Sequence, residues 1–304
     1  MATRKLRPEL EDLARRLEES GDYRVLRRLV PPGRYADDDG APRRTAIALD
    51  IETTGTASAS DEIIELSVIP FEYSADDGRI FAVGRPLTQL EDPGRLVPPD
   101  VVQLTGITDA AVAGKRIDDR AVTKLLRNGD LVVSHNAAFD RPFLERRLPV
   151  FADVPWACSM VDVPWKDKGY AALGQEYLLE QHCGVFYEAH RAEPDALAML
   201  HLLATPFDSG EVPFGILLRT ALRKAVRIWA VGAPFDAKDK LKSRRYTWNP
   251  GEDGRPRAWH RTVSEDEQPA ELAWLREQVY GGRDGPWRLE DFDPRTRFST
   301  RGGA

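Results

Sequence analysis

Two acidic residues follow a short apolar run near the start of the chain, and their spacing is that of a cation site. The run Thr45-Ala-Ile-Ala-Leu has the composition of a strand buried on both faces, and Asp50 and Glu52 lie at its end. Side chains two apart on a strand point to the same side, so both carboxylates would face one spot. Such a pair repels unless a proton or cation lies between, and Mg²⁺ prefers oxygen ligands. The pattern predicts a metal site or, as the plain alternative, a strand that ends in solvent.

Further acids stand where other predicted elements begin or end. Asp140 follows a short apolar strand predicted over 130–134. Asp195 lies in the first turn of a helix whose leucines share one face, and His190 precedes that helix on a loop. Pro194 fixes the start of the helix, so His190 and Asp195 do not have to share one continuous helix and can converge. Four acids therefore stand at the ends of elements, and a histidine stands beside the last of them.

In order and context these residues resemble the DEDDh family of 3′-to-5′ exonucleases, which includes the proofreading epsilon subunit of bacterial replicative polymerase. The resemblance covers roughly residues 45–204 and rests on the segments Asp50-Ile-Glu52-Thr-Thr-Gly, Leu104-Thr-Gly-Ile107-Thr, His135-Asn136-x-x-Phe139-Asp140 and His190-x-Ala-x-x-Asp195. It implies a metal-dependent 3′-to-5′ exonuclease that shortens DNA and releases nucleoside 5′-monophosphates. It also implies two Mg²⁺ or Mn²⁺ ions per active site.

The resemblance assigns the catalytic roles. The metal ligands would be the four acids, and His190 would take the proton from the attacking water. These expected catalytic residues are His190, Asp50, Glu52, Asp140 and Asp195.

The resemblance also implies substrate contacts. Thr53 would touch the terminal nucleotide, and Leu104 and Ile107 would form an apolar wedge against its base. Asn136 would orient the site or only cap the following helix, since Asn is a good cap. Phe139 would contact the substrate or belong to the core.

The elements that must position these residues alternate in type. Strands predicted from Thr45, over 62–73 and over 79–87 form an antiparallel meander, with Asp76-Asp77-Gly78 as the hairpin signal. A helix predicted over 117–127 precedes a strand at 130–134, and this alternation of strand, helix and strand implies parallel pairing. A fifth strand is predicted at 156–163. We therefore expect an α/β fold with a mixed five-stranded sheet flanked by helices, ribonuclease-H-like by resemblance, and a small C-terminal α+β domain.

The domain prediction has four parts. Residues 1–44 would form an N-terminal extension of two short helices that cap the main domain, with a linker; residues 45–205 would be the exonuclease domain. Residues 214–280 would be a basic accessory domain, because 214–261 hold 12 Lys/Arg against 4 acids. Its tryptophans could stack bases or simply fill a core. Residues 281–304, rich in Arg, Gly and Pro, would be a disordered tail.

Composition bounds the location and the partners. The 304 residues carry a net charge of -6 and two cysteines without a C-x-x-C motif, and we find no signal peptide or membrane span, so we expect a soluble cytoplasmic protein with no membrane partner. The expected partner is nucleic acid, chiefly single-stranded 3′ ends of DNA, with a DNA polymerase or repair protein as a possible second one. The alternatives are an RNA-trimming exoribonuclease of the same family, a non-catalytic nucleic-acid-binding scaffold with the same fold, and a phosphodiesterase for small nucleotides.

Overall fold

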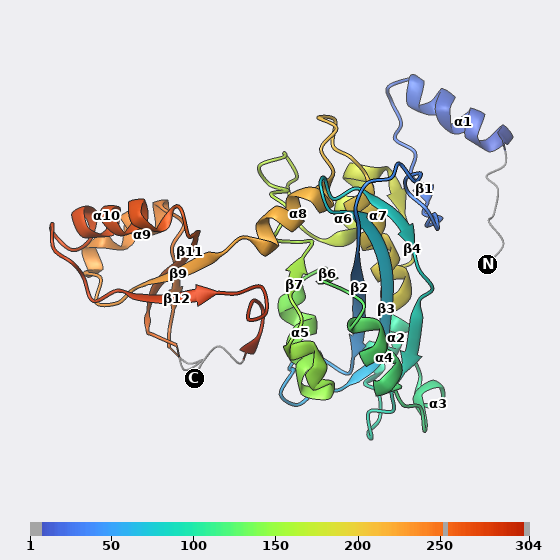
Figure 1. Cartoon of the computed structure of the whole chain (residues 1–304). Helices are drawn as coiled ribbons and strands as arrows, with labels where there is room; N and C mark the ends of the chain where they lie inside the picture. The colour runs from blue at the N-terminus through green and yellow to red at the C-terminus, as the bar shows by residue number, and fades with distance from the viewer. Residues whose placement is uncertain (1–7, 252–254, 301–304) are drawn as a thin grey trace. The chain divides into compact units, whose positions relative to one another are not determined.

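The computed structural model describes residues 8–251 and 255–300. The chain divides into two compact units, Met1–Ala221 and Leu222–Ala304 (Figure 1). Predictions for residues 1–7, 252–254 and 301–304 lie outside the described residues. Within the described ranges no helix combines the length and apolarity needed to cross a membrane.

The first unit is built on a mixed sheet. Its strands are β2 (Arg43–Thr53), β3 (Ile63–Ser74), β4 (Ile80–Val83), β5 (Leu87–Leu90), β6 (Val132–Ser134) and β7 (Trp156–Cys158). They lie in the order β4-β3-β2-β6-β7, and β5 also pairs with β3. The β2, β3, β4 and β5 pairings are antiparallel, whereas β6 pairs parallel with β2 and β7 parallel with β6. The predicted α/β class with a mixed sheet is confirmed.

The predicted third strand is two strands rather than one. Pro70 of β3 has no N–H to donate to the ladder, and the neighbouring chain leaves the sheet opposite it. Gly84 lies there, and an added Cβ would come within 2.8 Å of the Pro70 ring. The sheet therefore contains six strands rather than the predicted five, since β4 and β5 share one edge of β3.

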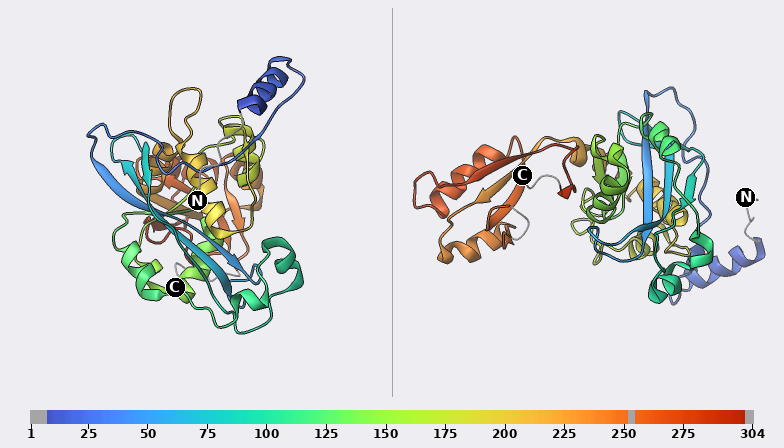
Figure 2. Two further views of the ribbon diagram at one scale, coloured as in Figure 1. Left: turned by 90° about the vertical axis from the view of Figure 1, so that its right-hand side faces the viewer. Right: turned by 90° about the horizontal axis from the view of Figure 1, so that it is seen from below.

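Helices cover both faces of this sheet (Figure 2). They are α2 (Pro99–Thr105), α3 (Asp109–Val112), α4 (Asp119–Leu126), α5 (Ala137–Arg147), η1 (Pro149–Ala152), α6 (Gln175–Leu178), the π-helix η2 (Leu179–Cys183), α7 (Ala192–Ala204) and α8 (Pro213–Leu222). Helix α7 packs on β2 and β3, and α5 packs on β6 and β7. Residues 46–49 of β2 are fully buried because both of their faces are covered.

Helix α8 belongs to the first unit, so the predicted start of the accessory domain at residue 214 is wrong. Phe214 packs edge-on against Phe71 and Tyr73 at centroid distances of 5.2 and 5.1 Å. Leu217 and Ala221 lie in the same apolar core. Burial of the apolar face of α8 stabilises the packing of this helix on the core.

The N-terminal segment differs from its prediction in two ways. A helix, α1, forms over Pro8–Glu19, but Leu10, Leu13 and Leu17 are 56%, 53% and 41% exposed, so α1 does not cap the main domain. The predicted second helix is instead β1 (Arg27–Arg28), which pairs parallel with β8 (Val185–Phe186). Backbone pairing with a distant segment has overridden the local helical pattern.

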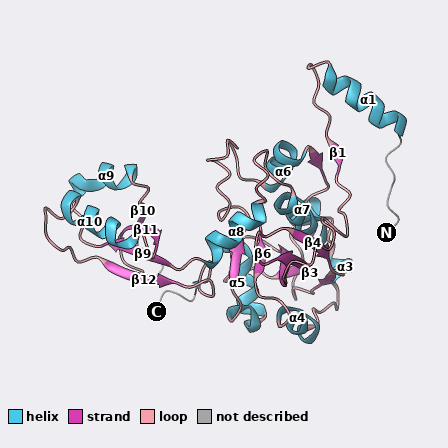
Figure 3. Ribbon diagram, turned by 45° about the horizontal axis from the view of Figure 1, so that its top comes forward, coloured by secondary structure: helices cyan, strands magenta, loops and turns pink. Residues whose placement is uncertain are grey.

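The second unit is a small α+β fold (Figure 3). It contains β9 (Ala225–Ala230), η3 (Phe235–Ala237), α9 (Lys238–Ser243), β10 (Thr247–Asn249), β11 (Ala258–Ser264), α10 (Gln268–Gln278) and β12 (Arg288–Phe292). The antiparallel sheet has the order β10-β11-β9-β12, and Val226, Ile228, Leu241 and Leu275 lie in its core. The prediction of a disordered tail is wrong for β12, because its backbone pairs with β9 along five residues.

Candidate active site

The central strand β2 carries the first two acids of the predicted site. Asp50 and Glu52 lie opposite Ser67 and Glu65 of β3, and the register shifts between Glu52 and Thr53, where the strand pair ends. Helix α7 packs on these two strands and brings Asp195 from a distant part of the sequence. Asp50, Glu52 and Asp195 each offer a carboxylate oxygen, and these oxygens lie within 4.8 Å of one another. We call these three residues the carboxylate cluster.

Asp140 lies beside the carboxylate cluster. Its side chain comes from α5 and is only 2% exposed, and its Oδ2 has no hydrogen-bond partner among the described residues. Its negative charge raises the pKa of Asp50, which indicates that the two groups are close. A buried carboxylate oxygen without a partner is costly unless a cation or proton satisfies it.

Burial and mutual repulsion raise the pKa values of the acids. Burial raises the pKa of Asp50 well above its ordinary value, and the charges of Asp140 and Asp195 add to this. Burial, then the charges of Asp195 and Glu65, raise the pKa of Glu52 to about 8. Burial raises the pKa of Asp140 to about 7. Each of these groups is therefore costly to ionise unless positive charge is brought to the site.

Asp195 is held in place by hydrogen bonds from three neighbours. Its Oδ1 accepts a bond from the Tyr187 hydroxyl at 2.5 Å and a longer one from Gln175 Nε2 at 3.4 Å, and its Oδ2 accepts from the Arg191 backbone N–H at 2.9 Å. Pro194 sits without difficulty in the first turn of α7, as expected. Tyr187 and Gln175 were not predicted, because nothing in their spacing links them to Asp195.

His190 lies on the loop before α7, as predicted. It is exposed, and its backbone adopts the left-handed conformation with φ of 68°. Such a conformation is uncommon for a residue other than glycine and costs energy that surrounding contacts must supply. Burial raises the pKa of Asp195, and the hydrogen bonds from Tyr187 and Arg191 and the nearby His190 offset part of this rise, which indicates that the imidazole lies near the carboxylate cluster.

Glu65 is a buried acid beside the site that the sequence analysis missed. It is 1% exposed and pairs with the Arg191 guanidinium at 2.6 Å, and it accepts the Ala192 backbone N–H at 2.9 Å. A carboxylate at the first residues of a helix is favoured by the helix dipole. Glu65 thus ties the start of α7 to β3. A charge inside the apolar run 63–69 was the signal that could have revealed it.

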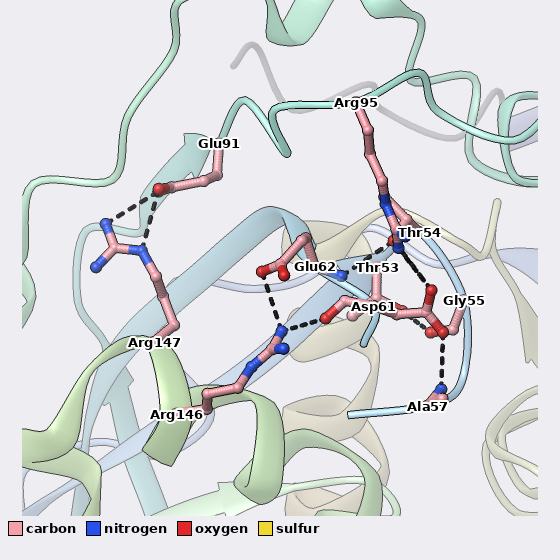
Figure 4. A network of polar contacts seen from close by, with 10 residues as sticks. All are labelled: Thr53, Thr54, Gly55, Ala57, Asp61, Glu62, Glu91, Arg95, Arg146 and Arg147. Atoms are coloured by element: carbon pink, nitrogen blue, oxygen red, sulfur yellow. Dashed lines mark hydrogen bonds and ion pairs between the residues drawn. The ribbon is translucent and has the colours of Figure 1, made fainter. Parts of the chain in front are cut away.

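The turn after the first two acids is fixed by a polar network (Figure 4). Asp61 accepts bonds from the Ala57 backbone N–H at 2.9 Å and from Arg95 at 2.6 Å, and Arg95 also bonds the Thr54 hydroxyl. Gly55 allows the close approach, because a Cβ there would come within 2.5 Å of the Asp61 carboxylate. This network keeps the end of β2 from moving freely.

The predicted substrate contacts are found in different environments. Thr53 is buried, and its hydroxyl donates to the Gly55 carbonyl at 2.6 Å. Leu104 is 55% exposed at the end of α2, as a wedge would require. Ile107 is 2% exposed in a core with Ile64 and Val97, so its predicted role as a wedge is wrong. The chain turns inward there at Gly106, whose φ is 71°.

The segment His135-Asn136-x-x-Phe139-Asp140 contains residues that contact the rest of the protein as well as the acid Asp140. Asn136 is exposed with φ of 67° and makes no side-chain cap bond to α5, so the capping role considered for it is wrong. Phe139 is half-buried, with its ring 5.2 Å from that of Phe143. His135 bonds Ser159 and the Leu173 carbonyl, and burial lowers its pKa to about 4.

Comparison with known proteins places the site in a family. The exonuclease family model named RNase T matches residues 47–203. The chain is 31% identical over 166 residues to DNA polymerase III subunit epsilon of Treponema pallidum, covering 52% of this chain and 74% of that protein. It is 31% identical over 173 residues to the PolC-type DNA polymerase III of Clostridium perfringens, but covers 53% of this chain and only 11% of that protein.

Solved structures give weaker likenesses. Exonuclease X in complex with 5′ overhanging duplex DNA is 21% identical with a TM-score of 0.38, covering 56% of this chain and 99% of that one. E. coli exonuclease I in complex with a 5cy-dT13 oligonucleotide is 14% identical with a TM-score of 0.43, covering 73% and 63%. Both TM-scores are too low for either likeness to assign a function or a substrate to this chain. Since the family model spans more than half of the residues, the chain belongs to this exonuclease family of phosphodiester hydrolases, and the resemblance in its motifs is confirmed.

Proposed function

We propose that the protein is a metal-dependent 3′-to-5′ exonuclease that shortens DNA and releases nucleoside 5′-monophosphates. The observation that carries the proposal is the meeting of Asp50, Glu52 and Asp195 within 4.8 Å at the end of a buried strand. The epsilon subunit and the PolC protein named above are DNA polymerase III components, which favours DNA over RNA as substrate.

The carboxylate cluster suits hard divalent cations. All of its donors are carboxylate oxygens, the ligands that Mg²⁺ and Mn²⁺ prefer, and Asp140 adds a buried oxygen without a partner. Asp50, Glu52, Asp140 and Asp195 would hold two ions. Such ions, when bound, make water a better nucleophile and steady the negative charge on the leaving oxygen.

The remaining residues would position groups and move a proton. His190 would accept the proton of the attacking water, and its exposure would let that proton pass on to solvent. Tyr187 and Gln175 would keep the Asp195 carboxylate from rotating, since both donate to its Oδ1. Thr53, Leu104, Asn136 and Phe139 remain proposed substrate contacts, of which Leu104 has the exposed apolar surface that a base could cover.

The test is digestion of matched 5′-labelled single-stranded DNA, duplex DNA and RNA with Mg²⁺, Mn²⁺ or EDTA. The His190→Ala and Asp195→Asn variants are compared with Asp100→Asn, an exposed acid on α2. We expect a metal-dependent ladder that shortens from the 3′ end, lost in the first two variants and kept in the control. Faster shortening of RNA would replace DNA by RNA as the substrate. Strand binding without any product would point to the non-catalytic scaffold.

We also propose that the second unit holds the substrate strand. Lys242 and Arg245 are exposed and have no side-chain partner within the described parts of the chain. Trp248, on the edge strand β10, is 45% exposed, and its ring lies 5.6 Å from that of Trp259. Exposed aromatic rings next to free cations are what stack bases and bind phosphates.

The backbone of Arg245 further supports a strand-binding role for Lys242, Arg245 and Trp248. Its φ is 66°, in the region where glycine is the unstrained choice after a helix. By contrast, the neighbouring Arg244 is engaged within the unit, pairing with Glu271 and lying over the Trp274 ring. A strained arginine whose side chain has no hydrogen-bond or ion-pair partner among the described residues is consistent with a role outside the unit.

Strand binding by the full-length Asp195→Asn protein tests this role. The probe is a 5′-labelled single-stranded oligonucleotide in EDTA, followed by fluorescence anisotropy. We expect Arg245→Ala and Trp248→Ala each to weaken binding by about tenfold, since one stacked base contributes roughly 1–3 kcal/mol. Arg276→Ala is the matched control, because Arg276 is already paired with Asp284 at 2.5 Å. Unchanged binding in both variants would show that the second unit does not hold the strand.

A further inference from the structure

We propose that the segment Arg24–Leu29, which we call the N-terminal strap, positions the loop that carries His190. The inference rests on the proposed function, because it assigns the strap an effect on catalysis through His190. The strap lies outside the residues that match the exonuclease family model, 47–203. It would be an addition made by this chain to the shared catalytic unit.

The strap is joined to the loop by backbone hydrogen bonds. Strand β1 pairs parallel with β8, and these two strands form a separate two-stranded sheet. The Arg27 N–H donates to the Gly184 carbonyl at 3.1 Å, and the Leu29 N–H donates to the Phe186 carbonyl at 2.7 Å. Strand β8 is followed at once by Tyr187, which bonds Asp195, and three residues later by His190. The pairing therefore acts directly on the segment that leads to the site.

Side chains of the strap also bond residues of the loop before and after β8. Arg24 donates to the Gln181 side chain at 2.7 Å and to the Glu180 carbonyl. Arg28 pairs with Glu188 at 2.8 Å, and its guanidinium lies 5.0 Å from the centre of the Phe186 ring. The Arg28 ion pair is exposed, so it contributes little by itself. The strap nevertheless contacts this stretch at residues 180, 181, 184, 185, 186 and 188.

The loop depends on contacts from other segments, because its own backbone is irregular. It leaves the π-helix η2, turns at Gly184 with φ of 66°, and reaches His190 with φ of 68°. Strand β8 has only two residues, and β1 is its sheet partner. A left-handed conformation at a residue other than glycine persists only where its surroundings impose it. The strap lies outside the matched residues and pairs directly with the segment that leads to His190.

Helix α1 provides the control, because its ion pairs reach the strap, and no hydrogen bond or ion pair joins α1 to the loop within the described ranges. Arg27 pairs with Glu11 and with Glu18 of α1, each at 2.7 Å. No residue of α1 is buried. Deleting residues 1–20 therefore removes α1 and keeps the strap, whereas deleting residues 1–30 removes both. The comparison isolates the strap.

The experiment measures kcat and KM on a dinucleotide for both deletions, each with His190 and with His190→Ala. We expect the 1–20 deletion to keep kcat and the 1–30 deletion to lower it by about tenfold or more with little change in KM, because a small displacement of a catalytic group is costly. In the His190→Ala background the residual activity is measured at raised enzyme concentration, and the 1–30 deletion should not lower it further. Hydrogen exchange of peptide 184–191 should rise only in the 1–30 deletion.

The outcomes separate this inference from the proposed function. An equal fall of kcat with and without His190 would make the strap a general structural element and overturn the inference. Unchanged exchange of peptide 184–191 would overturn it as well. If His190→Ala alone kept full activity, the proposed function would fail, while the exchange measurement would still decide whether the strap holds the loop. If the 1–30 deletion does not fold, Arg27→Pro, which removes the N–H that donates to Gly184, takes its place in the same comparison.

Discussion

Replacing Glu52 by glutamine should stabilise the protein when no metal is present. The pKa of Glu52 is raised from an ordinary 4.5 to about 8, chiefly by burial and then by the charges of Asp195 and Glu65. Between these two values the folded protein holds a proton that the unfolded chain has lost. The free energy of unfolding therefore falls as the pH rises from about 4.5 to about 8. A glutamine side chain does not titrate in this range, so the free energy of unfolding of the variant should not fall for this reason.

The size of the effect follows from the same two values. At pH 7 the unfolded carboxyl is ionised and the folded one is still mostly protonated, which corresponds to about 3 kcal/mol of lost stability for one group. We expect Glu52→Gln and the unchanged protein to be equally stable near pH 4 in EDTA. At pH 7 the variant should be more stable by up to about 3 kcal/mol. Saturating Mg²⁺ should shrink or reverse the gap, because bound metal stabilises the unchanged protein by mass action.

The assay is urea unfolding in EDTA between pH 4 and pH 8, read by hydrogen exchange of peptides from β2. A whole-protein signal would mix the two compact units, because the domains of a multidomain protein need not unfold together. Glu176→Gln, an exposed acid on α6, is the matched control and should follow the unchanged protein at every pH. A gap of the same size at pH 4 and pH 7, or a variant less stable at pH 7, would refute the reasoning.

Three further predictions concern other parts of the chain. Ile107→Ala should lower the free energy of unfolding by about 2–5 kcal/mol, whereas Leu104→Ala should leave it unchanged and raise KM; equal stability in the two would contradict the burial of Ile107. Tyr187→Phe should raise the Mg²⁺ midpoint for thermal stabilisation about tenfold, because Asp195 loses a donor; an unchanged midpoint would contradict this. Glu271→Ala should destabilise the second unit by roughly 2–3 kcal/mol in urea unfolding, since three donors lose their shared acceptor; a neutral effect would contradict it.

Local sequence was enough to place the acids at the ends of elements. The apolar run before Asp50 could only be buried, and a strand pointing two alternate residues to one side required Asp50 and Glu52 to meet. Pro194 fixed the start of α7, which put Asp195 in its first turn and left His190 on the loop. Each of these inferences depends on a few neighbouring residues, so chain-local rules were sufficient.

The errors came from contacts between distant segments. The N-terminal residues 27–28 have a helical pattern but pair with residues 185–186, and residues 288–292 look unstructured but pair with β9. Ile107 was expected to face the substrate and instead fills a core behind Gly106. Tyr187 gave no signal because its role depends on where α7 lies. Side-chain orientation set by packing of remote elements is not encoded in any short stretch of sequence.

The acids of the candidate site are spread over a long stretch of sequence, and this has a consequence for how the protein is made. Asp50 and Glu52 leave the ribosome before the other two acids, and β2 can pair with β3 soon afterwards, because these two strands are close in sequence. Asp140 comes later and Asp195 later still, with α7. The nascent chain therefore carries an incomplete site until Asp195, the last of these acids, has been made. Strand cleavage and the full electrostatic repulsion would both begin only when α7 docks on the sheet.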